Sequence, residues 1–212
     1  TRWALAWFEQ SGFSEGEYGV AETLSKAKDT SVAGMVAAGI VYASRGRLWV
    51  RDLHRFGATG IPGSEGAISP SWSFDGTQIG FAKDRKLWTW ALAGGQSTEV
   101  CGIPGATGFN QATWNKDGKI VFAAWRGGLY EVASTGGAPR LVLAPADSEV
   151  DFHHPLFMPD GRHIVTVAHR KEGANPVVVI SLPDGKRRDL AAFEGLENVV
   201  PSPSGHLLMN FT

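Results

Sequence analysis

The sequence predicts an all-β protein in which one four-stranded antiparallel unit recurs along the chain, preceded by a short α-helical extension. Three observations favour this fold class. A tight-turn motif recurs four times at nearly constant spacing, and each copy is followed by short apolar segments in the same order. Glycine is also abundant, with 27 Gly and 11 Pro in 212 residues. Excess glycine without a collagen-like period indicates many tight turns, and many turns in a folded chain indicate many short strands.

The recurring motif is a strand that carries an aromatic residue and ends in a turn with glycine. Its copies are Ser69–Gly76, Gln111–Gly118, His154–Gly161 and the weaker Asn198–Gly205. The residues before the turn glycine stand 42, 43 and 44 residues apart, and are Asp75, Asp117, Asp160 and Ser204. A period of about 40–45 residues with four strands in each unit is typical of β-propeller blades.

Each unit has the same internal order of strand, turn and strand. The second strands are predicted at 78–82, 119–123, 163–167 and 206–211. The third strands are predicted at Leu87-Trp88, Leu129-Tyr130 and 177–180, and the fourth at 97–101, 139–143 and 187–190. The turns between third and fourth strands are Gly94-Gly95, Gly136-Gly137 and Asp184-Gly185. This order predicts an up-and-down antiparallel sheet in each unit.

A partial unit precedes the first complete one, and another ends the chain. The first has predicted strands at 40–44, 47–53 and 58–62 and lacks a first strand, whereas the last has two strands. We therefore expect a helical segment over 1–38 and a partial propeller over 39–212, with three full four-stranded blades and two partial blades. The predicted blades span about 39–66, 67–106, 107–148, 149–194 and 195–212.

Residues 1–38 lack the strand pattern and are predicted to be helical. Trp3, Ala6, Trp7 and Gln10 suggest one helical face, and Glu22 and Lys26 form an i,i+4 pair in a second helix. Thr30-Ser31 can cap a third short helix that runs to about Ala38.

The turn motif, the Leu-Trp strand and the Ala-Gly-Gly hairpin together resemble the repeats of TolB-type β-propellers, the PD-repeats that are loosely called WD-like. The similarity covers about 39–212 and is greatest to the propeller that follows bacterial serine/threonine kinase domains. The motif residues are structural, so the resemblance implies a fold and no particular activity. It also implies a bacterial extracytoplasmic location, although we expect no signal peptide in this chain.

The segments Trp7–Gln10 and Gly19–Met35 resemble the C-terminal part of a family of bacterial adenine-specific DNA methyltransferases. Neither the cofactor glycine loop nor the catalytic tetrad is present, so the resemblance implies no activity. Two origins stay open for residues 1–38. They form either an ordinary N-terminal extension or a helical fragment joined to a piece of propeller in a chimera.

Composition and charge exclude several classes of partner. With 20 Lys and Arg against 21 Asp and Glu, the net charge of −1 gives no bulk attraction to nucleic acid or to an anionic membrane. No apolar run reaches about 18 residues, so we expect no membrane insertion. The single cysteine, Cys101, excludes an internal disulfide and a Cys-based zinc site.

Polar side chains stand six residues before each turn position, at Ser69, Gln111, His154 and Asn198. We call these four the funnel residues. Because they share one register just ahead of a core strand, the repeat predicts a polar ring around one mouth of the central channel, where a ligand would bind. The alternative is that these side chains satisfy backbone groups where the chain enters each blade.

Histidine is the residue type that would bring chemistry to this mouth. His154 is the candidate catalytic residue, and His154, Gln111 and Asp151 form a candidate nitrogen and oxygen site for a divalent metal ion. His153 and His154 are adjacent, so in an extended strand they point to opposite sides and cannot both face one metal. Within the TolB-like class, oligogalacturonate lyases use a histidine-rich metal site at this mouth. No cofactor is otherwise predicted.

Three functions stay open on this evidence. The first is a non-enzymatic propeller scaffold that binds a small molecule or a partner protein. The second is a hydrolase or metal-dependent lyase that works at the funnel, and the third is a chimeric or truncated fragment without an evolved function as a unit. An open arc of blades leaves strand edges unpaired, so we expect homo-oligomerisation to complete the ring.

Overall fold

The computed structural model describes residues 22–23, 39–52, 56–105, 108–202 and 206–212. Within these ranges the regular structure consists of β-strands, in four four-stranded sheets and one two-stranded sheet. Every strand pair is antiparallel, and each sheet is built from strands consecutive along the chain. None of the described residues forms a helix long and apolar enough to cross a membrane.

Each sheet keeps its strands in chain order. The first contains β1 (Glu22–Thr23), β2 (Gly39–Ser44), β3 (Arg47–Asp52) and β4 (Thr59–Gly60), and the second contains β5 (Ile68–Trp72), β6 (Gln78–Lys83), β7 (Lys86–Ala91) and β8 (Ser97–Gly102). The third contains β9 (Phe109–Trp114), β10 (Lys119–Ala124), β11 (Leu129–Ala133) and β12 (Arg140–Leu143). The fourth contains β13 (Glu149–Phe157), β14 (His163–Arg170), β15 (Asn175–Ser181) and β16 (Arg187–Phe193), and the last contains β17 (Leu196–Pro201) and β18 (Leu207–Phe211).

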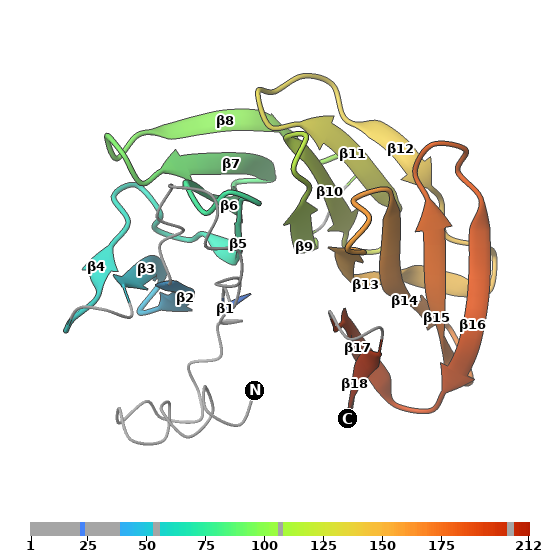
Figure 1. Cartoon of the computed structure of the whole chain (residues 1–212). Coiled ribbons are helices and arrows are strands. Elements are labelled where there is room, and N and C mark those ends of the chain that lie inside the picture. Colours follow the sequence, from blue (N-terminus) through green and yellow to red (C-terminus); the bar gives the residue numbers. More distant parts are fainter. Residues whose placement is uncertain (1–21, 24–38, 53–55, 106–107, 203–205) are drawn as a thin grey trace.

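The sheets follow one another around a curved arc, with β5, β9, β13 and β17 toward its interior and β8, β12 and β16 at its outer rim (Figure 1). The first strand of each sheet packs against the first strand of the next. This radial arrangement is that of a β-propeller. The β1–β4 sheet and the β17–β18 sheet lie at the two ends of the arc (Figure 1).

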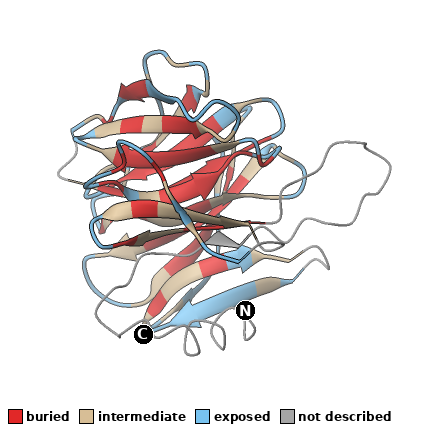
Figure 2. Ribbon diagram, turned by 90° about the vertical axis from the view of Figure 1, so that its left-hand side faces the viewer, coloured by how far each residue is buried: buried red, intermediate tan, exposed pale blue. Residues whose placement is uncertain are grey.

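The core consists of apolar layers between successive sheets, and Figure 2 shows in red the buried residues of the strands on either side. One layer joins Val41 and Leu48 of the first sheet to Trp72 and Phe81 of the second. Three further layers follow along the arc, and the last joins β14 and β15 to Leu196 and Val199 of β17. No sheet buries its apolar faces by itself, so each depends on its neighbours for stability.

The predicted repeat is confirmed at the level of single residues. The aromatic residue of each motif pairs across the sheet with an isoleucine of the second strand, in the pairs Trp72–Ile79, Trp114–Ile120 and Phe157–Ile164. The turn glycines have nearly equal φ angles of 71°, 72° and 66° at Gly76, Gly118 and Gly161. Positive φ is costly for other residues, which explains why glycine recurs there. The fourth copy, Gly205, lies outside the described residues.

The structure differs from the sequence expectation at the N-terminal side. Glu22 and Thr23 were expected in a helix, but they form strand β1, which pairs with Val41 and Ile40 of β2. This strand takes the place of the first strand that the sequence indicated to be missing from the first sheet. The i,i+4 pattern of Glu22 is a local signal, and pairing with a distant strand overrides such signals. The other predicted helical residues of 1–38 lie outside the described residues.

Close packing of Trp114 against Gly80 fixes the spacing between the second and third sheets. The Trp114 indole N–H donates a hydrogen bond to Ser71 Oγ at 3.1 Å. A Cβ on Gly80 would lie 2.9 Å from Trp114 Cζ2, closer than van der Waals contact permits. In the third sheet, Val121 stands where the second sheet has Gly80. Val121 packs in a cluster with Phe157, which is equivalent to Trp114 but smaller. At this position the third sheet therefore combines a bulkier side chain on its second strand with a smaller aromatic residue on the next sheet.

We expect Gly80→Val to destabilise the protein by about 1–3 kcal/mol, the usual cost of overpacking a well-filled core. Trp114→Phe in the same chain should recover part of that loss, because it recreates the pairing of Val121 with Phe157. Urea unfolding of both variants tests this. Gly102→Val is the matched control, because a Cβ at Gly102 meets nothing within 4 Å. If Gly80→Val costs no more than Gly102→Val, the packing argument is wrong.

Candidate functional site

The funnel residues all lie on the first strand of their sheets: Ser69 on β5, Gln111 on β9, His154 on β13 and Asn198 on β17. The structure brings two of them together, because His154 Nδ1 lies 2.5 Å from Gln111 Oε1. This contact joins the third sheet to the fourth. Asn198 Oδ1 is buried without a hydrogen-bond partner among the described residues. Burial lowers the pKa of His154, and the charge of His153 lowers it further, so the neutral imidazole is favoured.

An unusual backbone conformation occurs at two of these positions. Ser69 and His154 have φ angles of 48° and 47°, in the left-handed region that residues other than glycine seldom adopt. Each precedes a proline, and each lies where the pairing register shifts, between Ile68 and Ser71 in β5 and between His153 and Leu156 in β13. Such bulges redirect side chains, and they occur often beside functional sites.

The bulge in β13 gives the two adjacent histidines different partners. His154 contacts Gln111 on the preceding sheet, whereas His153 Nε2 lies 3.2 Å from Asp151 Oδ1. His153 Nδ1 lies 3.5 Å from Glu197 Oε2 on the following sheet. Since the predicted metal site combined Asp151 with His154 and Gln111, the structure divides that set between two places.

Asp151, His153 and His169 form a separate group, which we call the Asp151 cluster. His169 Nδ1 lies 3.4 Å from Asp151 Oδ1, and the two imidazole rings have centroids 4.8 Å apart. The other carboxylate oxygen, Oδ2, accepts a hydrogen bond of 2.9 Å from the backbone N–H of Arg126 in the β10–β11 turn. Residues around the third and fourth sheets therefore meet at one carboxylate, and His153 connects this group to Glu197 of the last sheet.

Charge and burial act against each other in this cluster. Burial by itself would raise the pKa of Asp151, but the His153 side chain and the Arg126 backbone N–H outweigh it and lower that pKa. Burial would likewise lower the pKa of His153, yet the carboxylates of Asp151 and Glu197 raise it. An ionised carboxylate is thus favoured at the centre of the cluster.

Sequence reasoning singled out Asp151 but missed His153 and His169 as its neighbours. His169 stands directly opposite Asp151 in the pairing of β13 with β14. That register depends on the bulge at His154, which leaves no sign in the sequence beyond the proline that follows it. Because His153 and His154 are adjacent, the predicted metal site included His154 and left out His153. In the structure His153 contacts Asp151, whereas His154 contacts Gln111.

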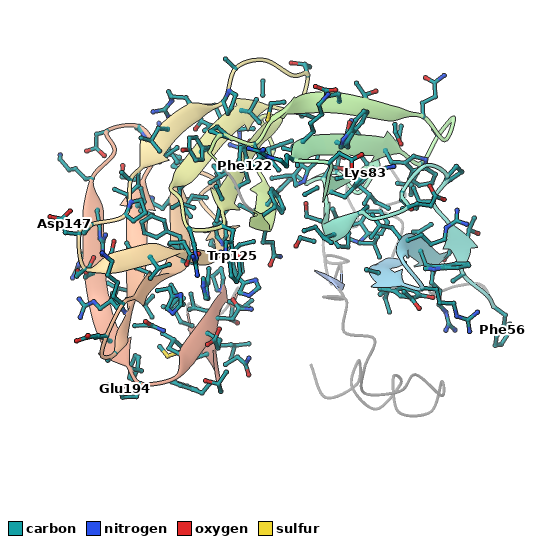
Figure 3. All side chains as sticks on the ribbon, turned by 180° about the vertical axis from the view of Figure 1, so that it is seen from behind. Phe56, Lys83, Phe122, Trp125, Asp147 and Glu194 are labelled. Carbon is teal, nitrogen blue, oxygen red and sulfur yellow. The ribbon has the colours of Figure 1, made fainter. Side chains whose placement is uncertain are left out.

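An exposed aromatic residue lies close to this region. Trp125 precedes Arg126 and remains 46% exposed, and Figure 3 shows it on the inner side of the arc. Asp147 and Glu194, labelled in the same view, lie farther out along the rim (Figure 3). The interior of the arc thus presents an aromatic surface near the polar groups of β9 and β13.

Comparison with known proteins agrees with this architecture. TolB from Acinetobacter baumannii superposes with a TM-score of 0.61 at 19% identity, over 79% of this chain and 44% of that one. The β-propeller domain of Cps50 (Swd1) from Myceliophteria thermophila gives a TM-score of 0.67 at 16% identity, over 94% of this chain and 64% of that one. A putative TolB from Agrobacterium tumefaciens gives a TM-score of 0.61 at 12% identity, over 73% of this chain and 61% of that one.

These likenesses define the class of protein: the chain has the fold of TolB-like, WD-like β-propellers. It spans less than half the length of TolB from A. baumannii. A family model described as a domain of unknown function, DUF8807, matches residues 1–69, which include the first sheet as well as the N-terminal segment. No curated protein matches the chain.

Proposed function

We propose that the chain is a non-catalytic β-propeller scaffold, which binds a small molecule or a partner protein at the inner side of its arc. The observation that carries this proposal is that polar side chains of the repeat are engaged in holding strands together. Ser71 accepts the indole hydrogen bond of Trp114, and Asp75 accepts from Ser73 and Thr77 within its turn. Gln111 and His154 contact each other across two sheets.

The side chains that would serve a hydrolase are engaged in the same way. Ser64, which stands between glycines in the sequence, is fully buried. Its hydroxyl donates to the carbonyl of Ile61 at 2.7 Å and accepts the backbone N–H of Leu48 at 3.0 Å. His154 faces the amide of Gln111, which cannot act as a nucleophile. These contacts favour a scaffold over a hydrolase or lyase at the funnel.

Two features support binding at the interior of the arc. Trp125 offers an exposed aromatic surface there, and aromatic side chains dominate the lining of ligand sites. The buried Asn198 Oδ1 lacks a partner among the described residues, so an unsatisfied hydrogen-bond acceptor stands at the funnel position of the last sheet. The match of the family model across residues 38 and 39 also supports one evolved unit in this region over a chimeric junction at that boundary.

A panel of chromogenic esters, phosphate esters and glycosides tests the non-catalytic part of the proposal. We expect the wild-type chain and His154→Ala to show the same background rate on every substrate, because His154 has a structural partner and no nucleophile beside it. Circular dichroism confirms that the variant is folded. Turnover that falls at least about tenfold in His154→Ala would show a catalytic role and contradict the scaffold proposal.

We also propose that the open arc is completed by further copies of this chain. The last sheet supports this, because its exposed apolar side chains include Val200, Leu208, Met209 and Phe211. Strand β18 is exposed along most of its length, as its pale blue colour in Figure 2 shows. Elsewhere along the arc the apolar face of a sheet is covered by the next sheet. A second copy would bury this face and pair the free edge of β18.

Light scattering coupled to size-exclusion chromatography measures the assembly in solution. We expect a mass of at least two chains for the wild type, and a shift toward the monomer in Leu208→Lys. Leu190→Lys is the matched control, since Leu190 is an exposed leucine on β16 that lies away from this face. A stable monodisperse wild-type monomer, or equal masses for the two variants, would contradict ring completion by this face.

A further inference from the structure

Asp151 Oδ1 lies between two imidazole rings without a hydrogen bond of acceptable geometry. Asp151 is 1% exposed, so this carboxylate is shielded from bulk solvent. Its partner Oδ2 is already held by the Arg126 backbone N–H, which fixes the orientation of the carboxylate. A buried charged oxygen without a hydrogen bond is costly, and a bound cation is one of the few ways to compensate it.

The three side chains converge because of the strand geometry. Asp151 and His153 are two residues apart in β13, so their side chains lie on the same face of the strand. His169 of β14 stands opposite Asp151, and paired residues share a face. Their ligand atoms, one from each residue, all lie within 4.8 Å of one another.

The two separations from the carboxylate oxygen match those between ligands of one metal ion. Asp151 Oδ1 is 3.2 Å from His153 Nε2 and 3.4 Å from His169 Nδ1. Two ligand atoms each about 2.1 Å from a tetrahedral zinc ion are about 3.4 Å apart. Two imidazole nitrogens with one carboxylate oxygen form a donor set that suits zinc, iron, cobalt or nickel in the divalent state, rather than magnesium or calcium.

The surroundings also resemble those of a metal-binding histidine. A histidine that binds a metal through one ring nitrogen usually donates its other N–H to a carboxylate, which orients the ring. Glu197 Oε2 lies 3.5 Å from His153 Nδ1, on the side of the ring away from Asp151. The side chain of His169 is 43% exposed, which leaves a path for the ion and room for a water ligand.

We propose that Asp151 Oδ1, His153 Nε2 and His169 Nδ1 bind one divalent first-row transition-metal ion at the contact between the fourth and last sheets. Glu197 is a positioning residue that orients His153. The site replaces the earlier combination of Asp151 with His154 and Gln111, and it stands whether or not the scaffold proposal is correct. Binding would tie β13 and β14 to β17 through Glu197.

Zinc titration of tag-free protein, stripped with chelator, tests the proposal. We expect isothermal titration calorimetry to show one Zn²⁺ per chain, and Co²⁺ to give visible absorption bands typical of nitrogen and oxygen ligands. His169→Gln and His153→Gln should each lower zinc affinity at least about 100-fold. His169→Gln is the primary variant because the His169 side chain is 43% exposed and lies outside the apolar core, and circular dichroism verifies the fold of the variant.

His163→Gln is the matched control. His163 lies on β14 like His169 but contacts Asp160, so it does not belong to the cluster. This variant should bind zinc as the wild type does. Glu197→Gln should keep one zinc per chain but weaken affinity about 10–100-fold, the usual effect of removing a carboxylate that orients a ligating histidine.

The proposal fails if the stripped wild-type protein binds less than one zinc per chain at micromolar concentration. It fails equally if His169→Gln binds as tightly as the wild type, or if His163→Gln loses binding to the same extent. Such an outcome would not bear on the scaffold proposal or on ring completion, because the substrate panel and the light-scattering experiment do not depend on the Asp151 cluster.

Discussion

The contact between the aromatic residue at the end of β5, β9 or β13 and the preceding sheet is the interaction on which the structure depends. Trp114 packs against Gly80, and its indole N–H donates a hydrogen bond to Ser71 Oγ. Together these two contacts fix the distance between the second and third sheets. Burial of an aromatic side chain contributes about 2–3 kcal/mol. Because the contact recurs along the chain, each sheet is stabilised by its neighbours rather than by a core of its own.

The same contacts position the candidate site. β13 is held against β9 by three side-chain links: Asn110 Nδ2 to the carbonyl of Phe152, Gln111 to His154, and the backbone N–H of Phe157 to Thr113 Oγ1. These links place the start of β13 beside the β10–β11 turn, where the Arg126 N–H reaches Asp151. The geometry of the Asp151 cluster therefore depends on how the third and fourth sheets pack together.

The repeat and its structural residues could be predicted because they are local. The turn glycines need positive φ, and the aromatic residue recurs at a fixed distance before them, so both are visible as a period in the sequence. The pairing of Trp72, Trp114 and Phe157 with equivalent isoleucines follows from that period. Strand order within the second, third and fourth sheets needed no further information, because each turn joins neighbouring strands.

The site could be predicted only in part, because it depends on pairing register and on contacts between sheets. Asp151 and His154 were recognised, but the bulge at His154 determines which partner each histidine meets. His169 enters the cluster only through the register of β13 with β14, and Glu197 only through the packing of the last sheet. Strand β1 was missed for the same reason, since its partner β2 is distant in sequence.

Hydrogen–deuterium exchange measured by mass spectrometry tests the central claim most directly. If inter-sheet contacts stabilise the fold, exchange should be slowest in β6, β9, β10 and β14, whose sheets have neighbours on both sides. Exchange should be fastest in β18, at the exposed end of the arc, and Gly80→Val should speed exchange in β9 more than in β15. Equal protection of β18 and β9, or no difference between β9 and β15 in that variant, would contradict the account.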